Sequence, residues 1–217
     1  MNKANVVYRQ IAEEILQNRR AKLVERKIAK NLGISPDTVN NAIAPLKRIG
    51  AVTVQRRHFE VIDFKKLLLY WAVNRKFDKD IIYETYVPVK SPEEIENYLP
   101  EGIAFTNFSG YKKIFNESPA DYGEVYVYAE RKIVTEIKIR FSESNMSPKR
   151  GKYNNLIVLR PDSLLENSIE SHIISHSSVS LPQLYVDLWN NGSWMAYEFI
   201  KSLEKRIDEI YEKAILE

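Results

Sequence analysis

Ten polar or basic side chains between residues 35 and 58 form the set with the clearest chemistry in the sequence. An Asn side chain pairs with adenine through two hydrogen bonds, and Arg and Lys neutralise phosphates. Such residues bind double-stranded DNA when a helix and a loop present them together. The predicted DNA-binding residues are Ser35, Asp37, Thr38, Asn40, Asn41, Lys47, Arg48, Arg56, Arg57 and His58.

A second set of residues could bind magnesium. Glu136 and Lys138 lie two residues apart in a stretch where polar and apolar residues alternate. Asp121 or Glu124 lies upstream. Many metal-dependent nucleases hold Mg²⁺ and a water with an upstream acid and a Glu-x-Lys pair on one strand. Alternating Glu and Lys is also common on the wet face of a strand, and we favour that interpretation. A nuclease is kept as the enzymatic alternative.

Other catalytic and metal-binding patterns are incomplete. His172 and His176 are four apart, but their surroundings resemble strand and loop rather than helix, and no third ligand is evident. The chain has no cysteine, which excludes thiolate zinc sites, disulfides and a cysteine nucleophile. Its seven glycines form no phosphate-binding loop, and no Asp-x-Asp pair follows Gly192-Ser193, as nucleotidyl transfer would require. We therefore predict no enzymatic activity and no cofactor.

Residues 26–50 must position most of the first set, and they have the spacing of a helix-turn-helix. Ala29 suits the place where two helices cross, Gly33 relieves the tight turn, and Val39 lies six residues further on. Ser35 is a good N-cap for the second of these helices. The apolar residues expected to face inward are Ile28, Leu32, Ile34, Val39, Ile43, Leu46 and Ile49.

The surrounding chain extends this motif to a winged helix. Helices are predicted over 5–18, 24–32 and 36–49, the last of them ended by Gly50. Residues 51–64 then alternate as two short strands whose junction carries the two arginines and the histidine. Three helices followed by a β-hairpin form the winged helix arrangement, in which the hairpin commonly contacts phosphates or the minor groove.

The remaining sequence predicts an α+β protein with a mixed α/β C-terminal domain. An apolar helix over 64–75 precedes a boundary near residue 78, so the expected domains are 1–78 and 79–217. Residues 102–115 suggest a short strand, a turn at Ser109–Gly110 and a helix. Further strands are expected over 81–89, 124–130, 134–141 and 155–161. Further helices are expected over 91–99, 184–190 and 195–216, the last of them long and amphipathic. A polar loop is expected over 146–154, and a short apolar segment with a loop over 171–183.

Charge divides the chain at the same place. Residues 1–76 carry 16 Lys and Arg against 6 Asp and Glu, a net +10, whereas residues 77–217 carry 16 against 23, a net −7. A basic first third suggests a nucleic-acid module joined to a domain with another task. No apolar run is long enough to span a membrane and no secretion signal is apparent, so we expect a soluble, cytoplasmic protein.

Four segments resemble the AbiEi-type antitoxins: VSLPQLYVDLWNNG (179–192), FKKLLLYWA (64–72), FTNFSGYKKIF (105–115) and EVYVYAE (124–130). Together they extend over most of the chain, although Asn-Phe-Ser precedes the glycine of 105–115, where the family has Thr-Gly. The resemblance implies the antitoxin of a type IV toxin–antitoxin pair. Its winged helix would repress its own operon through inverted repeats, using positions 35–41 and 56–58. Its C-terminal domain would counteract a nucleotidyltransferase-like toxin.

The sequence is also compatible with two functions other than that of an antitoxin. A solo regulator could keep the winged helix and use the C-terminal domain to sense a small ligand, and the nuclease described above is the less favoured one. DNA binding by a single small module buries little surface, so a homodimer is expected, with cooperative monomers as the other arrangement.

Overall fold

The structure is a computed structural model that describes residues 3–18, 22–144, 153–170 and 178–216. The protein is α+β and divides into two compact units, which are described separately below. The first unit contains Met1–Arg75, Ser180–Val186 and Lys201–Glu217, and the second contains Lys76–Val179 and Asp187–Ile200. The units are therefore not two consecutive stretches, because two late segments of the chain group with its beginning.

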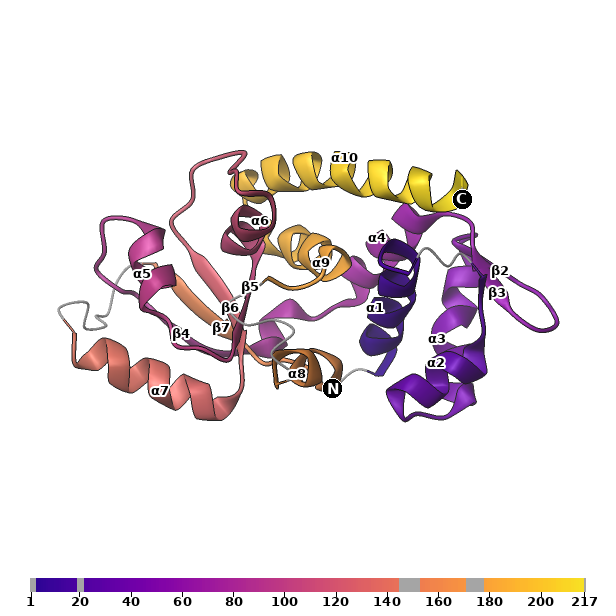
Figure 1. Ribbon diagram of the computed structural model, residues 1–217, viewed down its shortest axis with the longest axis horizontal. Helices are drawn as coiled ribbons and strands as arrows, with labels where there is room; N and C mark the ends of the chain where they lie inside the picture. Colours follow the sequence, from indigo (N-terminus) through magenta and orange to yellow (C-terminus); the bar gives the residue numbers. More distant parts are fainter. Residues whose placement is uncertain (1–2, 19–21, 145–152, 171–177, 217) are drawn as a thin grey trace. The chain divides into compact units, whose positions relative to one another are not determined.

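The first unit combines helices with a small antiparallel sheet (Figure 1). Its strands pair in the order β1-β3-β2, which places β3 in the middle. Both strands of the predicted hairpin are confirmed. In chain order the elements are α1 (Lys3–Leu16), β1 (Lys22–Leu23), α2 (Glu25–Leu32), α3 (Pro36–Arg48), β2 (Val52–Val54), β3 (Phe59–Val61) and α4 (Phe64–Asn74).

Local sequence explains where these helices begin and end. Gly33 ends α2 with φ +63°, a conformation that favours glycine, and its N–H bonds to the carbonyls of Ala29 and Lys30. Ser35 caps α3 by accepting a hydrogen bond from the Thr38 N–H at 3.2 Å. The predicted turn and N-cap are thus confirmed. Helix α3 ends at Arg48 rather than Ile49, one residue earlier than predicted.

The core of the first unit is apolar and includes residues from the end of the chain. Trp71 of α4, Phe59 of β3 and Leu46 of α3 are fully buried. The described part of α10 (Trp194–Leu216) contributes Tyr211, whose ring stacks on Phe64 at 5.2 Å between centroids. These contacts hold the hairpin and α3 on a packed scaffold. Of the side chains predicted to face inward, Ile49 is instead 41% exposed, because it caps the end of α3.

The second unit contains a four-stranded sheet with the order β4-β7-β6-β5. The β6–β7 pair is parallel, and the two outer pairs are antiparallel. Its strands are β4 (Ile81–Thr85), β5 (Ile103–Thr106), β6 (Val125–Ala129) and β7 (Leu156–Leu159). Its helical elements are η1 (Phe77–Asp80), α5 (Pro92–Tyr98), α6 (Asn107–Phe115), α7 (Arg131–Ser142), α8 (Ser163–Glu170), the end of α9 (Leu181–Asn191) and the start of α10.

Alternate residues of the strands divide the second unit into two packed faces. Phe105, Val127 and Val158 join one apolar cluster together with Ile95 of α5 and Ile137 of α7. These strand residues share one face of the sheet, because neighbouring residues of a strand point to opposite faces.

The opposite face holds a buried polar cluster. Asp187 of α9 accepts a hydrogen bond from the Thr106 hydroxyl at 2.6 Å and from the Tyr128 hydroxyl at 2.9 Å. All three residues are at most 1% exposed. They come from 105–115, 124–130 and 179–192, three segments that are well separated in the sequence. The three segments therefore meet at one carboxylate.

The strand predicted over 134–141 is wrong, because these residues belong to helix α7. Val134, Ile137 and Phe141 are buried at helical spacing, whereas Ile139 is 52% exposed. The run Ile137, Ile139, Phe141 alternates as a strand does, but the wider pattern has the period of a helix.

Smaller differences concern element boundaries. The turn predicted at Ser109–Gly110 is wrong, since both residues lie inside α6, which begins directly after β5. Strand β4 stops at Thr85, short of the expected 89, and α9 begins at Leu181, ahead of the expected 184. The loop predicted over 146–154 and the segment predicted over 171–183 lie largely outside the described residues.

No helix in the described part of the chain is both long and apolar enough to cross a membrane.

Candidate nucleic-acid interface

Helix α3 has one buried face and one polar exposed face. Val39, Ala42, Ile43 and Leu46 are at most 4% exposed and pack into the first unit. The exposed residues recur at helical spacing on the other side, which is how an amphipathic helix presents a stripe to a partner. These exposed residues are Asp37, Asn40, Asn41, Ala44, Lys47 and Arg48.

The first turn of α3 is held by its cap. The Ser35 and Thr38 hydroxyls lie 2.9 Å apart in a hydrogen bond, and Thr38 is half-buried. These two hydroxyls are therefore engaged in starting the helix. Asp37 is exposed beside them at the positive end of the helix dipole. A carboxylate at this place can accept a hydrogen bond from the amino group of cytosine.

The middle of α3 borders a groove of about 700 Å³. Asn40 and Asn41 line it, as do Lys47 and Arg48 one to two turns later, and Val54 of β2 contributes the opposite side. The structure thus brings four of the predicted residues together on one hollowed surface. Between them lies Ala44, whose methyl group lets another molecule approach the helix closely.

The β2–β3 hairpin projects from the helices and ends in a short tip (Figure 1). The Gln55 N–H donates to the His58 carbonyl at 2.8 Å, which leaves Arg56 and Arg57 as the two central residues of the tip. Both arginines are exposed, as a phosphate-binding role requires. His58 differs, because it is half-buried and its Nε2 lies 3.3 Å from a carboxylate oxygen of Glu60.

A second groove, of about 430 Å³, separates the hairpin tip from the start of α2. Arg26 lines it together with Arg56 and Arg57, and Glu25 is the acidic residue on the same lining. Helix α2 begins without a side-chain cap, and its first two residues, Glu25 and Arg26, line this groove. A helix N-terminus flanked by cations binds phosphate well.

Arg26 is a further candidate residue, which the sequence patterns did not single out. It is exposed in the first turn of α2, where a positive charge opposes the helix dipole. This unfavourable placement is the signal by which the sequence could have identified Arg26, because a cation at the positive end of a helix suggests a bound anion. The three arginines of the second groove are brought together from positions 30 residues apart in the chain.

The residues of the nuclease alternative do not assemble into a site. On α7, Glu136 and Lys138 diverge, since two residues of a helix are separated by about 200°. Glu136 pairs with Arg140 at 3.2 Å, and the Lys138 ammonium lies 4.8 Å from the centre of the Tyr83 ring. No group of three or more potential metal ligands occurs among the described residues. His172 and His176 lie outside them.

Comparison of the chain with protein-family models, curated proteins and solved structures finds no match.

Proposed function

We propose that the protein is a sequence-specific DNA-binding transcriptional repressor whose first unit is a winged helix-turn-helix. The observation that carries this proposal is the exposed face of α3, where Asn40, Asn41, Lys47 and Arg48 border one groove. The order of elements supports it, with α1, β1, α2 and α3 followed by the hairpin β2–β3. The net charge of +10 over residues 1–76 supports it as well.

In this proposal α3 enters the major groove of DNA, which admits one α-helix. Asn40 and Asn41 read base edges there, and the small Ala44 lets the helix backbone come close to the base pairs. Lys47 and Arg48 lie toward the end of the helix and neutralise phosphates. The readout by Asn is directional, because its amide offers one donor and one acceptor to adenine.

The hairpin and α2 supply contacts that do not depend on sequence. Arg56 and Arg57 reach the phosphates beside the major groove, and Arg26 with the first N–H groups of α2 binds a further phosphate. Such contacts set the position of the protein on the duplex, while α3 provides selectivity. Binding should therefore weaken steeply as salt concentration rises.

The proposal is tested by selecting binding sites from random double-stranded DNA and measuring affinity for the enriched sequence at several salt concentrations. Replacing Arg56 and Arg57 by Ala should weaken binding to all sequences alike. Each lost phosphate contact should also reduce the salt slope by about one. Arg131→Ala is the matched control, because Arg131 is an exposed arginine of the second unit. Failure to enrich any sequence, or equal losses for the control, would contradict the proposal.

We further propose that the protein is the antitoxin of a type IV pair and counteracts a nucleotidyltransferase-like toxin. The support is the resemblance of 64–72, 105–115, 124–130 and 179–192 to AbiEi-type antitoxins. Three of these segments also supply the side chains around Asp187, so they form one structural element rather than scattered similarities. Repression of its own operon and control of the toxin would then be joined in one chain.

This second proposal is tested in cells that express a nucleotidyltransferase encoded beside the gene. Co-expression of the full chain should restore growth, and variants that no longer bind DNA should still restore it if the two tasks are separable. A neighbouring gene of another kind, or continued toxicity, would favour a solo regulator. Sedimentation of the protein with and without operator DNA would distinguish a homodimer from monomers that bind cooperatively.

A further inference from the structure

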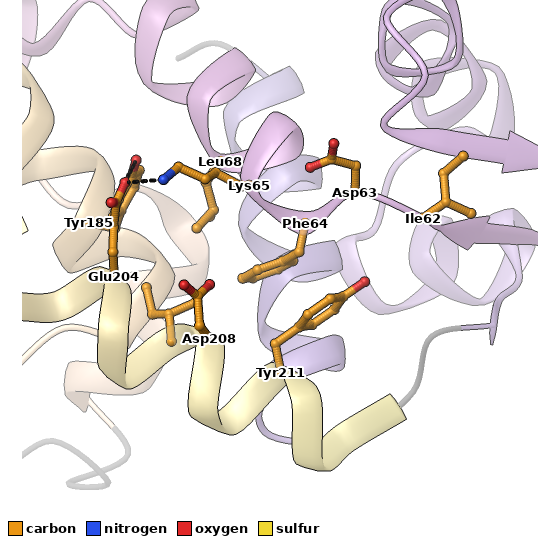
Figure 2. A pocket seen from close by; sticks show the side chains of 10 residues that line it. Ile62, Asp63, Phe64, Lys65, Leu68, Tyr185, Glu204, Asp208 and Tyr211 are labelled. Atoms are coloured by element: carbon orange, nitrogen blue, oxygen red, sulfur yellow. Dashed lines mark hydrogen bonds and ion pairs between the residues drawn. The ribbon is translucent and has the colours of Figure 1, made fainter. Parts of the chain in front are cut away.

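A cavity of about 200 Å³ opens within the first unit, between the start of α4 and the second half of α10 (Figure 2). The four residues Phe64, Leu68, Ile207 and Tyr211 give it an apolar floor. Bulk water occupies about 30 Å³ per molecule, and an ordered water needs two to four polar partners. The floor itself offers none, so an organic group with an apolar body is suited to the part of the cavity above it.

The aromatic part of the floor is already arranged as a platform. The rings of Phe64 and Tyr211 are nearly parallel, with an interplanar angle of 16° and 5.2 Å between centroids. Figure 2 shows Asp208 rising from α10 between this pair and Glu204. Because the rings cover each other's facing sides and Phe64 is only 3% exposed, a flat or aliphatic ligand would contact chiefly Tyr211 while a polar group reaches the carboxylate. Aromatic faces also attract cations.

Three carboxylates line the cavity, and two of them are already engaged. Glu204 pairs with Lys65 at 2.9 Å and accepts a hydrogen bond from Tyr185 at 3.1 Å. Asp63 caps α4 by accepting the Lys66 N–H at 2.9 Å and pairs with the Lys66 ammonium at 3.1 Å.

Asp208 is the third carboxylate; it is exposed to solvent and forms no hydrogen bond or ion pair with the residues that the structure describes. These carboxylates act on the neighbouring phenol. Burial, then the charge of Glu204 and its hydrogen bond, and then the charge of Asp208 raise the pKa of Tyr185. An anionic ligand would meet repulsion here, whereas a cation would complete the charge balance.

We infer that this cavity is a binding site for a small organic cation, with the ammonium group on Asp208 and the apolar body on the Phe64–Tyr211 platform. The carboxylate supplies a charge-assisted hydrogen bond, and the apolar floor supplies burial. A few converging polar groups above an apolar lining are the usual composition of a ligand site.

The position of the cavity connects it to the hairpin. Tyr211 donates a hydrogen bond of 3.5 Å to the carbonyl of Val61 at the end of β3. The next two residues, Ile62 and Asp63, line the cavity, and both of their N–H groups bond to the carbonyl of Ala51, directly before β2. A ligand here would alter the base of the hairpin and hence DNA affinity, a consequence that rests on the proposed function.

Binding is tested without DNA, by calorimetry of the full chain with 2-phenylethylammonium as the probe. Phenylacetate, which has a similar body and the opposite charge, is the control ligand. The cation should bind with one-to-one stoichiometry, and phenylacetate should not bind. Asp208→Asn should weaken binding of the cation about tenfold, as expected for the loss of one charge-assisted hydrogen bond. Glu209→Gln, the exposed neighbour on α10, should leave binding unchanged.

Equal binding of the two probes, no binding of the cation at millimolar concentrations, or unchanged binding to Asp208→Asn would overturn the inference. A second titration measures operator affinity with and without the cation, and a shift that disappears in Asp208→Asn would establish the coupling to the hairpin. A protein that binds the probe but no DNA would contradict the proposed function and leave the ligand site standing.

Discussion

The exposed face of α3 and the cluster around Asp187 use similar polar side chains in opposite surroundings. Asn40 and Asn41 lie in solvent on the lining of an open groove. Thr106, Tyr128 and Asp187 are buried and hydrogen-bonded to one another. A polar group in water can exchange its hydrogen bonds for those of a partner at little cost, whereas a buried one must keep its own.

This contrast predicts that the exposed residues of α3 serve the recognition of a partner, whereas the buried residues around Asp187 serve the stability of the fold. Substitutions of the exposed Asn40 and Asn41 on α3 should change DNA binding and hardly affect folding, because water replaces the lost side chain. Substitutions at Asp187 should do the reverse. The four predictions below test this separation in order of decreasing effect.

Among the substitutions of polar residues, replacing Asp187 by Ala should have the largest effect, lowering the free energy of unfolding by about 2–4 kcal/mol. Two hydroxyls, of Thr106 and Tyr128, would lose their common acceptor in a buried place. Urea denaturation measures the change, and the fraction that remains folded should bind operator DNA normally. Asp121→Ala, an exposed aspartate of the same unit, is the control and should change the free energy of unfolding by less than about 0.5 kcal/mol.

Replacing Asn41 by Ala should weaken binding to the preferred operator by about 1–3 kcal/mol and relax the preference at one base position. The unfolding free energy should stay nearly constant, since Asn41 is exposed. Affinities for operators altered at each position identify the base concerned. Asn97→Ala, at an exposed asparagine on α5, is the matched control. A uniform loss over all sequences would show that Asn41 contacts the backbone instead of a base.

Sequence alone predicted the helices and the hairpin of residues 22–61 well because their signals are local, but it did not assign 180–186 and 201–217 to the same unit. The Ser35 cap, the Gly33 turn and the alternation in β2 and β3 each depend on a few neighbouring residues. It could not predict the Asp187 cluster, whose partners lie 59 and 81 residues away in the chain. The second groove was missed for the same reason, since Arg26 meets the hairpin arginines only in the folded unit.

Replacing Ser35 by Ala should lower the free energy of unfolding by about 1 kcal/mol, the usual effect of losing an N-cap. The Thr38 N–H would lose the hydroxyl that it bonds at 3.2 Å. Thermal or urea denaturation measures this change. Ser163→Ala serves as the control, because Ser163 is exposed at the start of α8, where Asp162 accepts the Leu165 N–H. Equal stability of the Ser35 variant and wild type would mean that water satisfies the helix end as well as the side chain does.

The smallest effect is expected at Ile139, which distinguishes the helix from the strand that its alternating neighbours suggest. In a strand, Ile137 and Ile139 would share one buried face, and replacing either would be costly. In α7, Ile137 is fully buried and Ile139 is 52% exposed. Ile139→Lys should therefore change the unfolding free energy by less than about 0.5 kcal/mol, whereas Ile137→Ala should lower it by about 2–5 kcal/mol. Similar large losses for both variants would mean that 134–141 buries the face of a strand.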